Sequence, residues 1–136
     1  MNVIHIAAAL LIGPDSRTLL VRKRGTEAFM QPGGKIEPGE PAEQALVREL
    51  KEELGLDVEP ALLAFLGEFT APAVHEPEFE VICQLFQVHS SETVVPAAEI
   101  EEVIWIGADT HPDLPLAPLT RDVILPLYRQ RLAETI

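Results

Sequence analysis

Short apolar runs, separated by turn-forming residues, dominate the first part of the chain. Residues 3–12 (VIHIAAALLI) make one such run, and a Gly-Pro-Asp sequence follows it with the composition of a turn. Residues 17–24 (RTLLVRKR) then alternate between two faces, with Lys23 on the same side as Val21 and Arg24 on the opposite side. Together these runs predict a strand, a turn and a returning strand.

The spacing becomes helical after a loop over residues 25–40 that is crowded with Gly and Pro. We expect a helix over residues 41–54, since Pro41 fits a first turn and Gly55 can end the helix in a left-handed conformation. At 100° per residue, one arc of this helix carries its apolar side chains and can dock on a sheet. These side chains are Leu46, Val47, Leu50 and Leu54.

The remaining apolar runs predict three more strands, within residues 61–69, 79–88 and 101–107. The polar residues 70–78 should join the first two of them. Residues 119–132 predict a C-terminal helix, although Pro126 should kink it or delay its start. Strands with one helix between them and one helix last indicate an α/β fold, with a mixed sheet covered on two sides. We expect a single domain over residues 1–136.

Charge and cysteine content narrow the classes of partner. The net charge is −12, from 22 acidic and 10 basic residues, which argues against binding to nucleic acid or to an anionic membrane. An anionic ligand would therefore need a metal between itself and the protein. Cys83 is the one cysteine, so an internal disulfide is impossible and a cytoplasmic setting is expected. The apolar N-terminal run is too short to span a bilayer.

Three glutamates fall on one side of the predicted helix. Glu49, Glu52 and Glu53 lie within an arc of about 100°, roughly 120° away from the apolar arc. Glu49 and Glu53 form an i, i+4 pair of like charges, which costs a few tenths of a kcal/mol on an isolated helix. Helix physics alone leaves a metal-binding face and a solvated face both open.

The loop before the helix completes a spaced motif. Gly34 is followed after five residues by Glu40 and, after seven more, by RELKEELGL. This pattern matches every fixed position of the Nudix box, over the 23 residues Gly34–Leu56. The chain therefore resembles the Nudix hydrolases, and its GGKIEPGE sequence is similar to that of MutT-type members. The resemblance implies the Nudix fold, an α/β/α sandwich with a mixed β-sheet.

The resemblance also implies an activity. It is the Mg²⁺-dependent hydrolysis, with Mn²⁺ as a substitute, of the pyrophosphate bond in a nucleoside diphosphate linked to another moiety, such as a nucleoside triphosphate, ADP-ribose or a nucleotide sugar. By the same resemblance, the catalytic residues would be Glu49, Glu53 and Arg48, with Glu49, Glu53 and a loop residue as candidates for the general base. The metal ligands would be Gly33 through its carbonyl, Glu49, Glu52, Glu53 and Glu99. Mg²⁺ prefers such oxygen ligands, although Glu99 could equally be a solvated loop charge.

Three further residues are candidates for binding a small nucleotide. Arg24 and Lys35 could contact the phosphates or remain surface charges, and Phe29 could touch a base or anchor its loop. Pro72, sixteen residues past the box, has a placement typical of ADP-ribose pyrophosphatases. Relatives that clean oxidised purine nucleotides carry an asparagine near the start of the C-terminal helix. This chain has Leu119-Thr120-Arg121 in that neighbourhood, which argues against that specificity. Family members of this size often form homodimers.

Two other classes of function stay open. One is a non-catalytic nucleotide-binding or sensor module with a Nudix fold, although such modules usually lose glutamates from the box and this chain keeps all of them. The other is a partner-binding domain whose acidic helix is a docking face. A docking face would not need Mg²⁺, whereas catalysis would.

Overall fold

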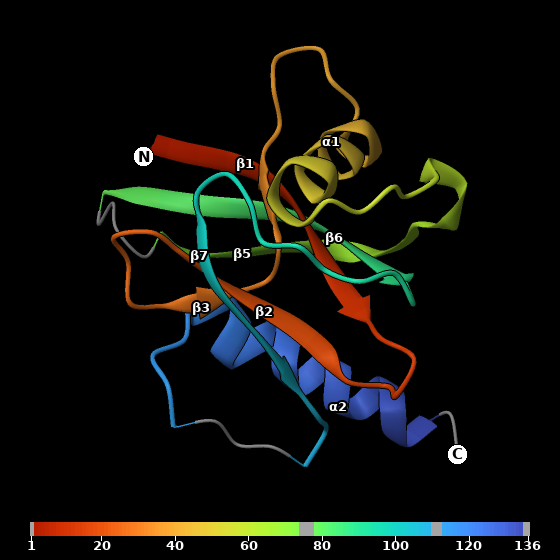
Figure 1. The fold of residues 1–136 in the computed structure, drawn as a ribbon. Coiled ribbons are helices and arrows are strands. Elements are labelled where there is room, and N and C mark those ends of the chain that lie inside the picture. Colours follow the sequence, from red (N-terminus) through yellow and green to blue (C-terminus); the bar gives the residue numbers. More distant parts are fainter. Residues whose placement is uncertain (1, 74–77, 110–112, 135–136) are drawn as a thin grey trace.

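A mixed seven-stranded sheet forms the centre of the computed structural model, which describes residues 2–73, 78–109 and 113–134. The main path of the sheet runs β3-β2-β1-β6-β5, with β4 paired to β1 and β7 paired to β2 (Figure 1). Its strands are β1 (Asn2–Ile12), β2 (Thr18–Lys23), β3 (Phe29–Met30), β4 (Gly33–Lys35), β5 (Ala64–Pro72), β6 (Phe79–His89) and β7 (Ile100–Ile106). The helical elements are α1 (Ala42–Leu54), a short 3₁₀ turn (Pro60–Leu62), a π-helical turn (Thr120–Ile124) and α2 (Leu125–Glu134).

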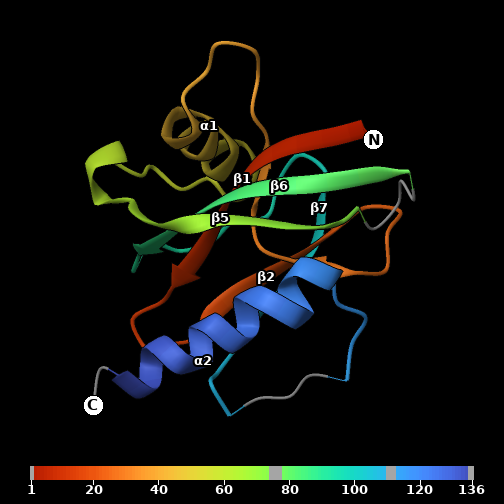
Figure 2. The same cartoon turned by 180° about the vertical axis from the view of Figure 1, so that it is seen from behind.

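The two α-helices cover opposite faces of the sheet, α1 on one side and α2 on the other (Figures 1 and 2). The central strand β1 is buried on both of its faces over residues 7–12, and the alternating side chains of this part divide between two apolar clusters. Leu11 packs with the leucines of α1, and Leu10 packs with Tyr128 of α2. The predicted α/β/α sandwich with a mixed sheet is confirmed.

Strand β2 returns antiparallel to β1 after a turn, as the sequence predicted, but β1 makes most of its pairing with other strands. The two strands pair at one position only, Ile12 with Thr18. Instead, β1 runs parallel to β6 over its whole length, from Asn2↔Phe79 to Ile12↔His89. On its other side, the middle of β1, Ile6 to Ala8, pairs with β4, which occupies the edge that further pairing with β2 would need.

Glycine makes the close approach of β4 to β1 possible. Gly33 has φ +149°, and a Cβ there would lie 2.2 Å from the carbonyl oxygen of Ala7. No side chain fits at this position. The sequence predicts a loop at Gly33–Lys35, because these residues include none of the β-branched or aromatic residues that mark strands.

Helix α1 is confirmed, with Pro41 directly before it instead of inside its first turn. Gly55 adopts φ +69° and its N–H donates to the carbonyl oxygen of Lys51, 3.0 Å away, which ends the helix as predicted. At the C-terminus, the π-helical turn comes first and α2 begins at Leu125. The helical backbone runs without a break from the π-helical turn into α2, so Pro126, which cannot donate a backbone hydrogen bond, lies directly after this turn inside a continuous helical segment.

The strand predicted at residues 61–69 begins later than expected, because residues 60–62 form the 3₁₀ turn, and it extends to Pro72. Residues 74–77 of the predicted connecting loop lie outside the described residues. Within the described part of the chain, no helix is long and apolar enough to cross a membrane.

Candidate active site

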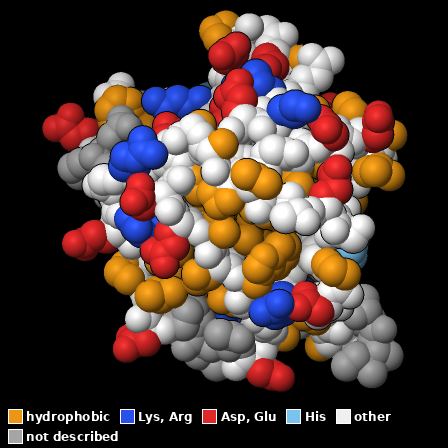
Figure 3. All heavy atoms as spheres, viewed as in Figure 1, with side chains coloured by type: hydrophobic (Ala, Val, Ile, Leu, Met, Phe, Trp, Pro, Cys, Tyr) orange, Lys and Arg blue, Asp and Glu red, His pale blue; other side chains and the backbone are white. Residues whose placement is uncertain are grey.

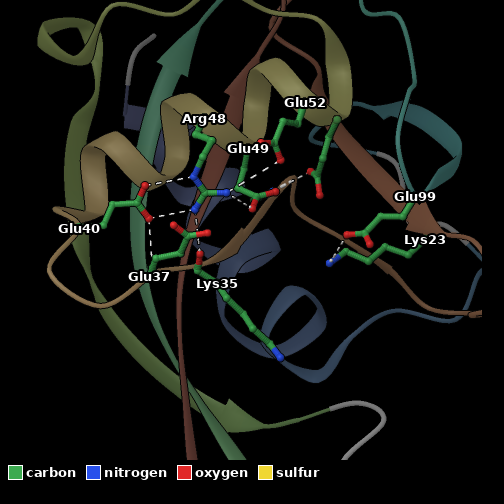
Figure 4. Close-up of polar contacts among 10 residues, drawn as sticks. Lys23, Lys35, Glu37, Glu40, Arg48, Glu49, Glu52 and Glu99 are labelled. Atoms are coloured by element: carbon green, nitrogen blue, oxygen red, sulfur yellow. Dashed lines mark hydrogen bonds and ion pairs between the residues drawn. The ribbon is translucent and has the colours of Figure 1, made fainter.

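Arg48 is the centre of a hydrogen-bond network that joins α1 to the preceding loop (Figure 4). Its guanidinium donates to both carboxylate oxygens of Glu40, from Nη2 at 2.9 Å and from Nε at 3.1 Å. It also donates from Nη1 to Glu49, at 2.8 Å, and from Nη2 to the carbonyl oxygen of Lys35, at 3.3 Å. Such a two-pronged pair between a guanidinium and a carboxylate fixes geometry as well as charge. Arg48 therefore holds Glu49 in one position relative to the glycine loop.

Glu53 is the most buried carboxylate of the described residues, with 1% of the residue exposed. Its Oε1 accepts a hydrogen bond from the N–H of Gly33, at 3.2 Å. Its Oε2 has no hydrogen-bond partner among the described residues. Burial raises the pKa of Glu53 to about 7, although the nearby Lys23 and the Gly33 N–H oppose the shift.

Glu49 and Glu52 lie beside Glu53 but are less enclosed. Burial raises the pKa of Glu49, an effect that the ion pair with Arg48 opposes. The side chain of Glu52 is 55% exposed, and its Oε2 lies 3.9 Å from Nη1 of Arg48. A Cβ at Gly34 would lie 2.5 Å from the carboxyl carbon of Glu49, so this glycine leaves the room that Glu49 occupies.

The acidic side chains approach one another without forming a closed metal cage. Among residues 2–73, 78–109 and 113–134, no three His, Cys, Asp or Glu side chains converge closely enough to hold an ion. Like charges repel one another when no cation lies between them, and here Glu49 and Glu52 both lie near Nη1 of Arg48, whereas Glu53 accepts from the N–H of Gly33. The donor set nevertheless suits a hard divalent cation, since it offers carboxylate oxygens beside a backbone carbonyl. The unpaired Oε2 of Glu53 is the observation that supports a cation at this place.

Glu99 lies near enough to Glu53 for its negative charge to help raise the pKa of that carboxyl, but its own carboxylate pairs with a lysine. Glu99 lies just before β7, where its side chain is 59% exposed and pairs with Nζ of Lys23 at 3.2 Å (Figure 4). Lys23 is a residue that the sequence analysis missed. The positive charge of Lys23 opposes the rise in the pKa of both Glu49 and Glu53, so Lys23 lies near the carboxylate cluster. The alternation along β2 could have identified Lys23, because it places Lys23 on the same face of the strand as Val21, which packs with the leucines of α1.

The three predicted substrate-binding residues have different surroundings. Arg24 is 69% exposed, pairs with Glu101 at 3.2 Å and does not line the cavity described below. Lys35 lines that cavity, and its side chain points away from Arg48. Phe29 is 3% exposed in the core, and its N–H donates to the carbonyl oxygen of Pro115 at 2.9 Å. Its ring is therefore unavailable to a base, and the alternative role as a loop anchor fits its position.

A cavity of about 210 Å³ adjoins the glycine loop on the side of Lys23. Charged side chains surround the visible face of the molecule, while apolar side chains gather toward its middle (Figure 3). The cavity lining is mostly apolar, with contributions from β1, β6 and the start of the C-terminal helical segment. It includes Ile4, Ile6, Val81, Leu119 and Ile124, together with the polar Lys23, Thr26, Gln31, Lys35 and Thr120. Gln31 was not among the residues that the sequence predicted for the site.

Known proteins resemble this chain over most of its length. The NUDIX domain model matches residues 3–127. A CTP pyrophosphohydrolase of Escherichia coli is 33% identical over 125 residues, which cover 87% of this chain and 86% of that protein. An ADP-ribose pyrophosphatase of Methanocaldococcus jannaschii is 36% identical over 88 residues, which cover 61% of this chain but only 50% of that protein. Among solved structures, a MutT NUDIX hydrolase from Burkholderia pseudomallei has the same fold, with a TM-score of 0.78 at 24% identity, over 93% of this chain and 98% of that one.

Proposed function

The chain belongs to the Nudix family and is a pyrophosphohydrolase, and we propose that it uses Mg²⁺ to cleave a nucleoside diphosphate linked to another moiety. Cleavage of the pyrophosphate bond releases a nucleoside monophosphate, together with pyrophosphate or a phosphorylated partner. The named relatives act on CTP and on ADP-ribose, which both contain a pyrophosphate attached to a nucleoside. We take residues 1–136 as one domain that carries this activity.

The observation that carries the proposal is the unpaired carboxylate oxygen of Glu53. A buried polar atom without a hydrogen bond costs about 1–3 kcal/mol, and more if it is charged. A helix that only covers a sheet would carry an apolar residue at this position. The cost is explained if Glu53 binds a cation or exchanges a proton during the reaction.

The helix glutamates and the glycine loop divide the remaining roles. Glu49, Glu52 and Glu53 would hold the divalent ion, with the carbonyl of Gly33. When bound, this ion supplies Lewis-acid stabilisation of the phosphate oxygens. Arg48 keeps Glu49 aligned through the hydrogen bond at 2.8 Å.

The general base that takes a proton from the attacking water would be Glu53, Glu49 or a loop residue. In the metal-free protein, burial raises the pKa of Glu53 to about 7, and a cation bound beside it would lower this value. The pKa of Glu49 is also raised, but its carboxylate is held by Arg48.

The charge of −12 supports a small nucleotide, as opposed to a nucleic acid, as the substrate. Bound divalent ions would offset the repulsion between the phosphates and an acidic protein. Homodimer formation stays a prediction. A cytoplasmic location also stays a prediction, and it is expected because the single cysteine, Cys83, is buried and free.

The test is a hydrolysis screen with purified protein and Mg²⁺ against nucleoside triphosphates, ADP-ribose, nucleotide sugars and dinucleoside polyphosphates. We expect turnover of at least one of these compounds, and we expect Glu53→Gln to lower kcat/KM by at least about 100-fold. Glu43→Gln is the matched control, since Glu43 lies exposed in the first turn of the same helix. Its kcat/KM should stay within about twofold of the parent.

The outcome also separates the rival functions. Nucleotide binding without turnover, unchanged by Glu53→Gln, would support a sensor module. Binding to a protein partner that is insensitive to EDTA, without hydrolysis of any compound, would support a docking face.

A further inference from the structure

A second cavity lies at the end of the sheet that is remote from the glycine loop. It is formed between the last turns of α2 and the C-terminal ends of β1 and β6, which run parallel. Its volume of about 510 Å³ falls within the roughly 300–1,000 Å³ of pockets that hold small molecules. Within the described part of the chain, it shares no lining residue with the cavity beside the glycine loop.

The two cavities follow one another along the same face of β1, because alternate side chains of a strand point to one side of the sheet. Ile4, Ile6 and Ala8 line the first cavity, and Leu10 and Ile12 line the second. Figure 2 shows the start of β1 and the end of α2 on opposite sides of the molecule. A nucleotide in the first cavity would therefore leave the second cavity open.

Arg131 brings to the second cavity a cation without a carboxylate partner. Its Nε donates to Oε1 of Gln87 at 2.7 Å, and its Nη1 and Nη2 have no partner among residues 2–73, 78–109 and 113–134. Because a guanidinium can only donate, the atom of Gln87 that faces it is the oxygen. The amide nitrogen of Gln87 then donates to Nε2 of His89, 3.2 Å away. Gln87 is thus held from both sides, and it fixes the guanidinium with its two outer nitrogens ready to meet an acceptor.

The charges around the cavity indicate how much negative charge its occupant carries. A guanidinium with two free nitrogens can bind a carboxylate or a phosphate through two parallel hydrogen bonds. Glu134 also lines the cavity and would repel a second negative charge. The net charge of −12 on the whole protein acts in the same direction. A carboxylate, with one charge, therefore fits better than a phosphate monoester, which carries nearly two.

The apolar part of the lining indicates the body of this occupant. Leu10, Ile12 and Tyr128 belong to the buried cluster on the α2 side of the sheet, and Leu132 packs against that cluster. The hydroxyl of Tyr128 already donates to the carbonyl oxygen of Ser16, 2.5 Å away. These side chains offer a hydrocarbon surface, which a hydrocarbon chain or ring would cover.

We propose that the second cavity is a binding site for a small organic monocarboxylate. The carboxylate pairs with the guanidinium of Arg131, and the hydrocarbon body packs against the apolar wall. This site is separate from the hydrolytic one, so it exists whether or not the proposed function is correct.

Titration of the full chain with hexanoate, followed in ¹H–¹⁵N NMR spectra, tests the proposal. We expect a Kd of about 5 mM or tighter, with the largest shifts at Gln87, His89 and Arg131. Hexanol lacks the charge, and inorganic phosphate lacks the apolar body, so each should bind at least about tenfold more weakly. Hexyl phosphate carries the same body with more negative charge, and it should also bind more weakly than hexanoate.

Variants assign the binding to these side chains. Arg131→Gln should weaken hexanoate binding at least about tenfold. Gln87→Glu places a carboxylate against the guanidinium and should weaken binding while Arg131 remains. Glu134→Gln removes the repelling charge and should strengthen binding of hexyl phosphate more than that of hexanoate. Arg129→Gln is the matched control, because it removes the same charge from α2 at a residue that does not line the cavity, and it should leave the affinity unchanged.

The same spectra show whether each variant is folded. A Kd for hexanoate weaker than about 5 mM, equal binding of hexanol and hexanoate, or an affinity that Arg131→Gln leaves unchanged would overturn the inference. Shifts centred on Lys23 and Lys35 would also overturn it, because they would place hexanoate in the first cavity. Arg131→Gln should leave the kcat/KM of nucleotide hydrolysis unchanged. A failed hydrolysis screen with hexanoate bound at Arg131 would reject the proposed function and uphold this site.

Discussion

Replacing Glu53 with glutamine should change how the stability of the metal-free protein depends on pH. The carboxyl group has a pKa of about 7 in the folded protein, against an ordinary value of 4.5. The folded state therefore holds this proton more tightly than the unfolded state does. The stability that results is complete below pH 4.5 and is lost as the pH rises through 7.

The magnitude follows from the difference between these two values. About 2.5 pKa units at about 1.4 kcal/mol per unit give roughly 3 kcal/mol. Glu53 is 1% exposed, so solvent screening does not reduce this figure appreciably. Glutamine stays neutral across the range, so relative to Glu53→Gln the parent should lose about 3 kcal/mol of unfolding free energy between pH 4 and pH 8.

Urea unfolding in the presence of EDTA, repeated at several pH values, measures this difference. The change with pH is the informative quantity, because an unpaired amide in the variant adds an offset that does not depend on pH. Glu52→Gln removes the same charge from a side chain that is 55% exposed, and its stability should follow that of the parent within about 0.5 kcal/mol. Parallel curves for the parent and Glu53→Gln would show that burial does not raise the pKa of Glu53, and would refute the reasoning.

Two other predictions concern backbone packing and the buried thiol. Gly33→Ala should lower the unfolding free energy by about 3 kcal/mol or more, because the new Cβ would lie 2.2 Å from the carbonyl oxygen of Ala7. Gly39→Ala, which has φ +76° but open space around it, should cost only about 1–2 kcal/mol, and equal losses in urea unfolding would contradict the packing argument. Burial raises the pKa of the Cys83 thiol from 9.0 to about 12, so a thiol reagent at pH 8 should label the native protein at least about 1000-fold more slowly than the urea-unfolded protein. Rapid labelling of the native protein would mean that this thiol is accessible.

Local patterns in the sequence predicted the elements whose structure is set locally. Helix α1 follows from the spacing of its leucines and from Gly55, and its glutamates come to one side because the helical repeat requires it. Strand β4 was missed because it forms only where Gly33 lies against the small Ala7 of β1, and that neighbour is distant in the sequence. The turn and returning strand after β1 were predicted correctly, but the pairing of β1 with β4 and β6 could not be read from the local pattern.

The candidate site shows the same division. The sequence motif identified Glu49, Glu53 and Arg48, which the structure places together. The motif could not reveal the hydrogen bond between Gln31 and Thr120, because these residues lie 89 positions apart and both lie outside the motif. Such a pair can be found only once the fold brings the start of the C-terminal helical segment against the loop before the glycines.

The parallel pairing of β1 with β6 delays the assembly of the protein during its synthesis. Asn2 pairs with Phe79, 77 positions later, and ribosomes add roughly 5–20 residues per second. The most apolar strand of the chain therefore waits for roughly 4–15 s before its main neighbour has been made. During this interval the nascent chain depends on the short β4 contact, or on chaperones, to keep that strand from associating with other chains.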